Sequence, residues 1–101
     1  MYFRISRFKL KPEAVSFVRE NFEKEVMGPA VASKGNRFFC VLLSTEEERV
    51  GSQISGWDSK EDCDRWLKEV WPIGYKQFEW VFEEKPQASF WELKWPGMIQ
   101  F

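Results

Sequence analysis

The stretch that most constrains the fold runs from Gln53 to Trp71. Residues 53–57 alternate polar and apolar side chains, which is typical of a half-buried strand, and they belong to a predicted hairpin strand from Val50 to Trp57. Ser59 then stands where a helix N-cap is expected, and Asp62 takes the place of the Glu that completes a capping box. Apolar residues follow along one face of a helix, namely Cys63, Trp66, Leu67, Val70 and Trp71. The stretch predicts a strand, a sharp turn and an amphipathic helix.

Patterns elsewhere predict three more strands and two more helical segments. Residues 2–10 form a predicted strand in which the apolar phase switches near Ser6 and Arg7, so we expect a bulge there or burial on both faces. A helix is predicted from Pro12 until Gly28 and Pro29 end it. The other predicted segments are a strand buried on both faces at 37–43, a charged turn at 45–49, a break at 72–74, a helical stripe at 75–82 and a last strand at 90–95.

This order of elements predicts the fold class. Strand, helix, two strands, helix and strand in one α+β domain most often form a ferredoxin-like βαββαβ fold, a four-stranded antiparallel sheet with both helices on one face. The other face is apolar here, because the segment from Phe38 to Leu43 has no polar phase and the last strand carries Trp91 and Trp95. Two such sheets packed face to face would bury this surface. We therefore expect a homodimer that forms a dimeric α+β barrel.

The composition indicates a single domain with a second apolar surface. The chain has 101 residues, of which 10 are Phe, 6 Trp and 2 Tyr, more aromatic side chains than one small core needs. We treat residues 1–101 as one domain, with 2–95 as its core and 96–101 as a C-terminal tail. The surplus of aromatic side chains indicates a subunit interface or a ligand cavity.

The charge pattern gives no sign of nucleic-acid or membrane partners. The formal net charge is −1, so nothing attracts the chain to nucleic acid or to an anionic membrane. Arg4, Arg7 and Lys9 interrupt the N-terminal apolar run, so we expect no signal peptide, and no apolar stretch is long enough to span a membrane. Cys40 and Cys63 have no metal or redox spacing and are interpreted as small hydrophobic residues in a reducing compartment. We expect a cytoplasmic protein.

Motifs for metal binding or nucleophilic catalysis are missing from the sequence. The chain contains no His, which rules out Ser/His/Asp and Cys/His arrangements. No Gly-rich phosphate loop is present. The acidic triplet Glu46, Glu47 and Glu48 is interpreted as the solvated tip of a hairpin, because consecutive side chains do not point at one ion. We expect no metal site.

Element order and local sequence together resemble the antibiotic biosynthesis monooxygenase (ABM) family of dimeric α+β barrels, over about residues 2–95. The closest local resemblance is to the haem-degrading branch, whose members carry Trp at the end of the third strand, Ser two residues later and a Trp-Leu pair in the helix. Trp57, Ser59, Trp66 and Leu67 match this pattern, with the same separation of nine between the two Trp. The resemblance implies the dimeric barrel fold.

The resemblance also implies positions for functional residues. Trp66 matches the active-site Trp of the haem-degrading enzymes, and Ser6 stands where they use an Asn in the first strand. Their proximal His falls at Tyr75 and Lys76, and neutral imidazole is the usual nitrogen ligand for haem iron. We therefore expect no cofactor, with haem as the less favoured alternative.

The cofactor-free members of the family oxidise electron-rich aromatic polyketides in an apolar, water-poor pocket. The first hypothesis is therefore a cofactor-independent monooxygenase that acts on an apolar aromatic small molecule. Its predicted catalytic residues are Ser6, Arg7, Trp66 and Tyr75. Its predicted substrate-binding residues are Phe39, Gln53, Trp57 and Trp91, with Ser55 as a further polar candidate. Ordinary core or interface packing is the alternative interpretation of each of these aromatic side chains.

Other functions fit parts of the same pattern. The second hypothesis is a non-catalytic ligand-binding or assembly module whose aromatic side chains serve the dimer. Residues 34–41 resemble the aromatic strand of an RNA-recognition module, but on the wrong strand of the pair and in an acidic chain. An amino-acid-sensing regulatory domain shares the element order, but such domains usually accompany a catalytic domain.

Overall fold

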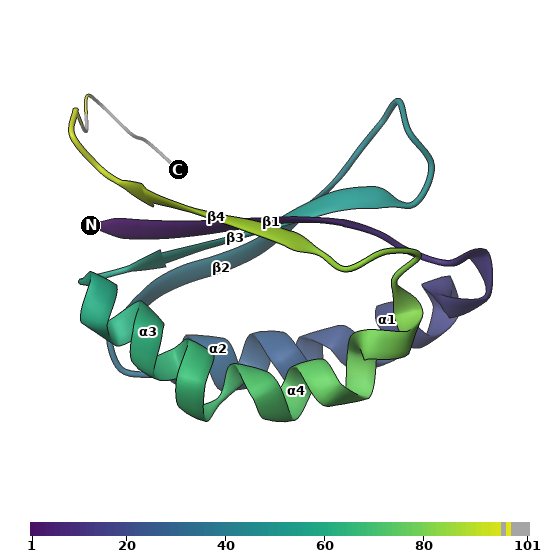
Figure 1. Cartoon of the computed structure of the whole chain (residues 1–101), viewed down its shortest axis with the longest axis horizontal. Helices are drawn as coiled ribbons and strands as arrows, with labels where there is room; N and C mark the ends of the chain where they lie inside the picture. The colour runs from purple at the N-terminus through teal and green to yellow at the C-terminus, as the bar shows by residue number, and fades with distance from the viewer. Residues whose placement is uncertain (96, 98–101) are drawn as a thin grey trace.

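The computed structural model describes residues 1–95 and 97, in which four strands form one antiparallel sheet with every helix on one side of it (Figure 1). The strands are β1 (Tyr2–Lys9), β2 (Asn36–Leu43), β3 (Val50–Trp57) and β4 (Gln87–Glu92). They lie in the order β2–β3–β1–β4, so β1 and β3 are central and β2 and β4 are the edges. This arrangement confirms the predicted α+β, ferredoxin-like fold class. The dimer stays a prediction.

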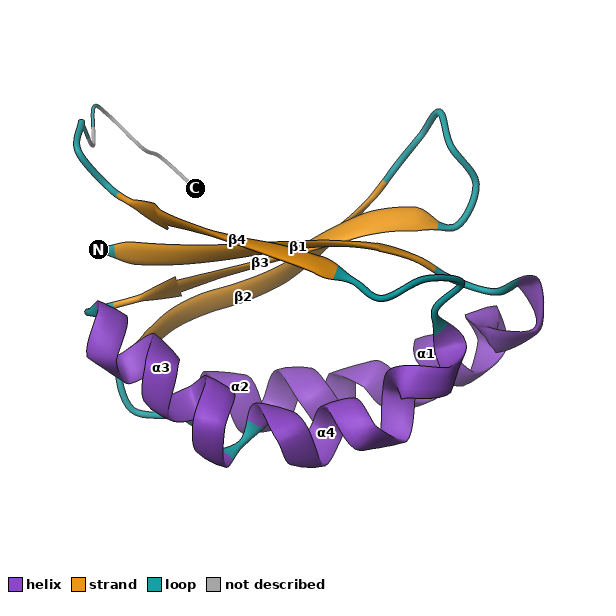
Figure 2. Cartoon of the chain, in the orientation of Figure 1, coloured by secondary structure: helices purple, strands orange, loops and turns teal. Residues whose placement is uncertain are grey.

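Two helical runs cover the same face of the sheet (Figure 2). The first run comprises η1 (Pro12–Ala14), α1 (Val15–Phe22), η2 (Glu23–Met27) and α2 (Gly28–Val31). The second comprises α3 (Lys60–Glu69), α4 (Trp71–Phe78) and η3 (Glu79–Val81). The runs approach closely at Gly74, where a Cβ atom would lie 3.2 Å from the carbonyl oxygen of Glu25. A glycine at this position lets the second run pack on the first.

The helix start predicted at Ser59 is confirmed. The Ser59 hydroxyl accepts a hydrogen bond of 3.2 Å from the backbone N–H of Asp62, which satisfies one of the free donors in the first turn of α3. Pro72 lies in the first turn of α4, where its missing N–H is not needed. It therefore begins a second helix directly after α3. The predicted break at 72–74 was wrong, because these residues lie within α4.

Gly28 and Pro29 do not end the first helical run, so that prediction was wrong. The five residues of η2 form a π-helical turn, in which the N–H of Gly28 donates to the carbonyl of Glu23. Pro29 then falls in the first turn of α2, where a residue without an N–H leaves no bond unmade. The wider turn removes the usual conflict between proline and the preceding helix, and the run continues to Val31.

The phase switch in β1 comes from burial on both faces, and no bulge occurs there. β1 pairs with β3 along its whole length without a register shift. Arg4, Ser6 and Phe8 are buried on the side that faces the helices, while Phe3 and Ile5 lie on the other side and are half-buried. A central strand of this sheet therefore places two polar side chains on its most buried face.

The last strand begins and ends three residues earlier than predicted. β4 pairs with β1 from Gln87, opposite Arg7, to Glu92, opposite Tyr2. One more backbone hydrogen bond follows the paired residues, from the N–H of Leu93 to the carbonyl of Met1 over 3.0 Å. The predicted tail at 96–101 lies outside the described residues, apart from Gly97.

The core lies between the sheet and the helices. Its fully buried side chains include Trp57 and Trp66, so two of the tryptophans that the sequence places nine residues apart meet in the core. The buried apolar residues are Phe8, Leu10, Ala14, Val26, Ala30, Phe39, Trp57, Cys63, Trp66, Phe78, Val81 and Phe82. No helix of the described part of the chain is long and apolar enough to cross a membrane.

Candidate functional site

Four polar side chains meet at the centre of the sheet, on the face that the helices cover. Arg4 and Ser6 come from β1, and Gln53 and Ser55 come from β3. The antiparallel register places Arg4 opposite Ser55 and Ser6 opposite Gln53. Each of the four is at most 5% exposed. Burial of a polar group costs free energy unless the group finds a hydrogen-bond partner. We therefore take these four side chains, the polar quartet, as the first candidate for a functional site.

A chain of aromatic rings lies against the polar quartet. Trp57 at the end of β3 contacts Trp66 of α3, with ring centroids 5.2 Å apart. Trp66 contacts Trp71 at 5.3 Å, and Trp71 contacts Tyr75 of α4 at 5.4 Å. Phe39 of β2 adds an edge-on contact to Trp66 at 6.3 Å. The second helical run thus supplies an aromatic wall to a site whose floor is the sheet.

Arg4 projects from the floor into this wall. The guanidinium carbon of Arg4 lies 4.9 Å from the ring centroid of Trp71 and 5.5 Å from that of Trp66, within the range of cation–π contacts. Burial lowers the pKa of Arg4, and the Cys63 thiol opposes this shift. An arginine remains charged in proteins at neutral pH, so the site contains a buried cation.

Three polar atoms of the site have no hydrogen-bond partner in the described structure. They are Nε of Arg4, Oε1 of Gln53 and Nε1 of Trp66. The indole of Trp57, in contrast, donates to the Ser55 hydroxyl over 3.0 Å. An unmet buried donor or acceptor costs about 1–3 kcal/mol, and a native structure retains it where a ligand or water supplies the missing partner.

An apolar cavity of about 260 Å³ adjoins the quartet at Gln53. This volume is near the lower end of ligand pockets, about 300 Å³. Its walls come from the sheet, α1 and the end of the second helical run, and Gln53 is the uncharged polar side chain among them. The cavity-lining residues that also belong to the core are Phe8, Leu10, Phe78, Val81 and Phe82.

The structure brings together most of the residues predicted for the site. Ser6 and Gln53 belong to the polar quartet, and Phe39, Trp57, Trp66 and Tyr75 belong to the aromatic wall. These six come from β1, β2, β3 and both helices of the second run. Sequence-distant positions therefore converge on one volume between the sheet and the helices.

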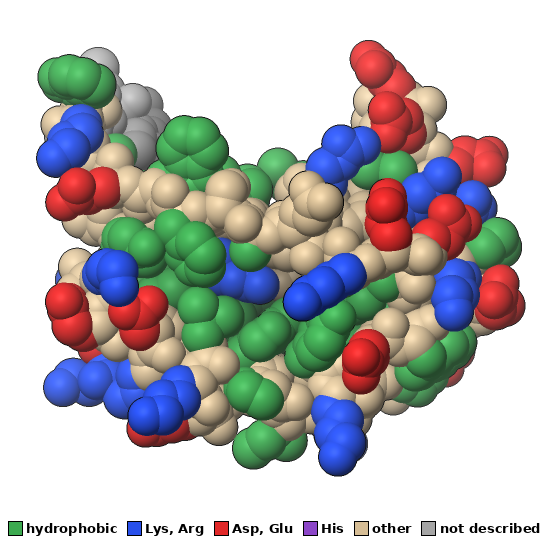
Figure 3. Space-filling model, in the orientation of Figure 1, with side chains coloured by type: hydrophobic (Ala, Val, Ile, Leu, Met, Phe, Trp, Pro, Cys, Tyr) green, Lys and Arg blue, Asp and Glu red, His purple; other side chains and the backbone are tan. Residues whose placement is uncertain are grey.

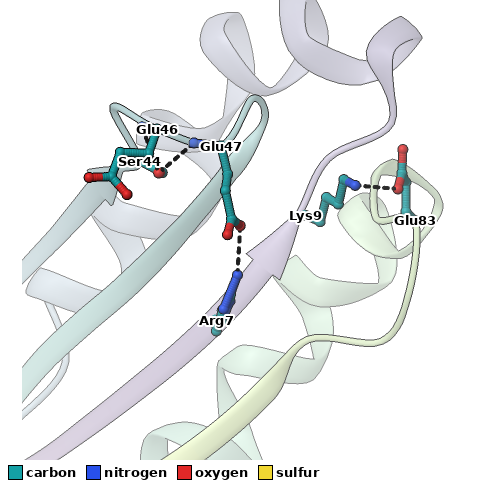
Figure 4. Close-up of polar contacts among 6 residues, drawn as sticks. All are labelled: Arg7, Lys9, Ser44, Glu46, Glu47 and Glu83. Carbon is teal, nitrogen blue, oxygen red and sulfur yellow. Dashed lines mark hydrogen bonds and ion pairs between the residues drawn. The ribbon is translucent and has the colours of Figure 1, made fainter.

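Arg7 and Trp91 do not join this group. Arg7 follows Ser6 in β1 and so points to the opposite face, where its guanidinium reaches Glu47 of the β2–β3 turn over 2.9 Å (Figure 4). Figure 4 also shows Lys9 paired with Glu83. Trp91 lies opposite Phe3 on the uncovered face and is 56% exposed. Neither side chain lies in the aromatic and polar site.

Sequence reasoning missed Arg4 and Trp71 as site residues. A charged residue in a strand is normally taken as solvent-facing, and Trp71 was assigned to helix packing. Arg4 shares the alternation phase of Phe8, but Arg7 shares that of Phe3 and Ile5, so the alternation does not single out Arg4.

The described residues do not fit an axial haem ligand or a metal site. Tyr75 packs against Trp71 and Phe82, and burial chiefly raises the pKa of its phenol, which disfavours the phenolate that ferric iron would take. Lys76 is exposed on the outer side of α4. Across residues 1–95 and 97, no three Cys, Asp or Glu side chains gather closely enough to hold a metal ion.

Comparison with known proteins finds similar proteins by structure only. No protein-family model matches the sequence, and no curated protein matches it significantly. A proposed antibiotic biosynthesis monooxygenase from Deinococcus radiodurans superposes with a TM-score of 0.85 at 10% identity over 100% of both chains. SnoaB, a cofactor-independent oxygenase from Streptomyces nogalater, gives 0.78 at 11% identity over 93% of each chain.

A haem-binding structure is also similar. MhuD, in a variant with two manganese protoporphyrin IX molecules per active site, gives a TM-score of 0.74 at 15% identity over 92% of this chain and 94% of that one. Identities this low carry the fold and not the activity. The chain described here therefore has the fold of the antibiotic biosynthesis monooxygenases, as its sequence pattern predicted.

Proposed function

We propose that the protein is a cofactor-independent monooxygenase that acts on an apolar aromatic small molecule bound between the sheet and the helices. The observation that carries the proposal is the polar quartet, which is buried next to an apolar cavity and retains unmet hydrogen-bonding atoms. The fold shared with SnoaB supports the same reaction class. Substrate pockets of this kind combine aromatic walls with a few convergent polar groups.

The residues have separate roles in this proposal. Trp66 and the aromatic wall exclude water and hold a planar ring by stacking. The amide oxygen of Gln53 accepts a hydrogen bond from a substrate hydroxyl, and Ser6 lies directly opposite it. Tyr75 closes the wall at the far end of the ring chain. The quartet contains neither a carboxylate nor an imidazole, so the substrate has to contribute an easily lost proton.

The chemistry requires no electrons from a cofactor when the substrate supplies all of them. Anthrone is a suitable probe, because its ring CH₂ group enolises readily. One oxygen atom of O₂ becomes the new carbonyl of anthraquinone, and the other leaves as water with the two hydrogen atoms of the CH₂ group. The protein would bind and orient the enol in a water-poor site, which aligns it for reaction with O₂.

We also propose that the protein works as a homodimer. The face of the sheet opposite the helices carries an apolar set from all four strands, and no helix or strand within residues 1–95 and 97 covers it. Its members are Phe3, Ile5, Phe38, Cys40, Leu42, Ile54 and Trp91. A sheet with one layer of helices is stable in water when its second face is polar or is buried. A second copy packed face to face would bury this apolar surface.

The uncovered face also favours a second candidate function. A dimeric module that binds a ligand without chemistry would need the same apolar face and the same pocket. The two candidates differ in one measurable property, the consumption of oxygen.

Oxygen uptake tests the proposal directly. Purified protein treated with a chelator is mixed with anthrone and with a panel of quinol-like aromatics in air, and uptake is corrected for the rate with heat-denatured protein. We expect saturable uptake and one anthraquinone formed per O₂ consumed. Gln53→Leu is expected to lower kcat/KM, whereas Ser52→Ala, on the other face of β3, is the matched control. If compounds of the panel bind but none causes oxygen uptake, the monooxygenase is refuted and the non-catalytic ligand-binding module is supported.

A further inference from the structure

The charge on Arg4 has no counter-charge in the described structure. The side chain is 5% exposed, and its Nε is buried without a hydrogen-bond partner. Arg7, Arg37, Arg49 and Arg65 each form an ion pair, whereas within residues 1–95 and 97 the buried Arg4 and the exposed Arg19 form none. A buried charge is normally paired, because its desolvation is otherwise uncompensated. The two Trp contacts compensate it only in part.

Cys63 does not supply the missing negative charge. Its thiol is the one titratable neighbour that acts on Arg4, and it is fully buried. Burial is the largest cause that raises the pKa of Cys63, to about 11, although Arg4 acts in the opposite direction. At neutral pH the thiol is therefore protonated and neutral. Two acidic residues of α3 pair with other cations, Asp62 with Arg65 and Asp64 with Lys60.

The side of the sheet next to Arg4 is open. Phe90 of β4 lies directly opposite Arg4 in the sheet, on the helix-facing side, and it stacks on Tyr2 with centroids 6.1 Å apart. Every residue of β4 is exposed, so no helix of the described structure covers this edge strand. Hydrophobic side chains, with basic atoms among them, are visible between β4 and the α3–α4 run in Figure 3. An aromatic shelf therefore leads from the surface to the buried guanidinium.

We propose that this shelf binds a planar aromatic anion, whose carboxylate or phenolate pairs with Arg4 while its rings lie against Phe90, Trp71 and Tyr75. This inference deepens the proposed function, on which it rests, because the anion would be the substrate. It would bind at Arg4 of the polar quartet and at Trp71 and Tyr75 of the aromatic wall, none of which lines the cavity at Gln53. Arg4 presents a planar fork of N–H donors that matches a carboxylate, and the unpaired Nε1–H of Trp66 is a further donor close by. The rings of the ligand would cover apolar surface of the protein that is now exposed, such as that of Phe90.

The surroundings favour an organic anion over an inorganic one. Phosphate or sulfate needs several donors to replace its water shell, and the described shelf offers one guanidinium and one indole among aromatic rings. A ligand with one charged end and an apolar body can pair its charge with Arg4 and pack its body against the aromatic rings. The ligand class is thus an aromatic acid or an acidic phenol.

Two matched probes test the charge requirement on the unaltered protein. 2-Naphthoate is an anion at pH 7, and 2-naphthamide is a neutral compound of the same shape. Binding is followed by quenching of tryptophan fluorescence and by calorimetry. We expect the acid to bind at least about tenfold more tightly than the amide, since hydrogen bonds to charged groups are the strong ones. Equal affinities, or no binding of either probe at millimolar concentration, would overturn the proposal.

Variants assign the preference to Arg4. Arg4→Met is expected to lower the affinity for 2-naphthoate about 10- to 100-fold and to leave the amide within about twofold. Arg37→Met is the control, because it removes an exposed guanidinium of β2 that pairs with Asp58. Arg4→Lys, which keeps the charge but not the fork, is expected to retain part of the preference. A preference that survives in Arg4→Met places the anion elsewhere and refutes the assignment.

The pH dependence of binding distinguishes a carboxylate ligand from a phenolate ligand. A carboxylate keeps the same affinity from pH 6 to 9, whereas 4-nitrophenol, which ionises in that range, gains affinity with rising pH if its phenolate is the bound form. This binding test is independent of turnover. Naphthoate binding at Arg4 without oxygen uptake would refute the monooxygenase and keep the anion site. Oxygen uptake with anthrone, without a preference for acids over amides, would refute the anion site and keep the monooxygenase.

Discussion

Replacing Arg4 by methionine should make the ligand-free protein more stable. Arg4 is 5% exposed and has no counter-charge among the described residues. The effective desolvation penalty of a buried ion is several kcal/mol, while each of its two Trp contacts, at 4.9 and 5.5 Å, returns about 0.5–2 kcal/mol. Methionine fills a similar volume without a charge. We therefore expect the free energy of unfolding to rise by about 1–3 kcal/mol.

The assay is urea denaturation at pH 7, followed by circular dichroism, with thermal melting as a second measurement. A gain of 1 kcal/mol corresponds to a rise in Tm of about 4–8 °C for a domain of this size. Arg37→Met is the control, because it removes an exposed ion pair that contributes about 0–1 kcal/mol. A loss of more than about 1 kcal/mol in Arg4→Met would show that the arginine is structural and would refute the reasoning.

Three further predictions concern the wall, the thiol and the uncovered face. Trp66→Ala should lower the free energy of unfolding by about 3–5 kcal/mol, because Trp66 is 2% exposed and contacts three aromatic rings; an unchanged urea midpoint would contradict its place in the core. The pKa of Cys63 is raised in the folded state to about 11, so the stability that its protonated thiol contributes is complete below about pH 9 and is lost between about pH 9 and 11. Cys63→Ala should therefore flatten the fall of stability in that range, and an identical pH profile would speak against a buried thiol. Ile54→Asp, at the centre of the uncovered face, should convert a dimer into a monomer in sedimentation experiments, whereas a wild-type monomer would refute the proposed interface.

The fold followed from the sequence because its elements repeat with clear periods. The Ser59 cap and the apolar stripe after it depend on local interactions. The uninterrupted apolar run at 37–43 predicted a strand correctly, but its predicted burial on both faces was wrong, because β2 is an edge strand in which only Phe39 is buried among the described residues. The end of the first helical run did not follow, because a π-helical turn accommodates Pro29. No residue pattern in the segment distinguishes this π-helical turn from an ordinary helix end, so the sequence alone does not predict it.

The site was only partly predictable. The aromatic wall could be predicted from the spacing of Trp57 and Trp66, since strand end and helix face both point inward. Arg4 and Arg7 could not be told apart by residue type, because β1 is apolar on both faces and its two phases look alike. The pairing of Arg4 with Ser55 depends on strand register, which a single sequence does not fix.

The central claim is that the ligand binds between the sheet and the helices, and the six Trp residues report on it directly. The measurement is a ¹⁵N–¹H spectrum of the indole N–H groups during titration with 2-naphthoate, with peaks assigned by single Trp→Phe variants. The account predicts that the signals of Trp66 and Trp71 shift with the same saturation curve while that of Trp80 stays in place. Shifts confined to Trp91 and Trp95, with Trp66 and Trp71 unchanged, would place the ligand outside the site and contradict the account.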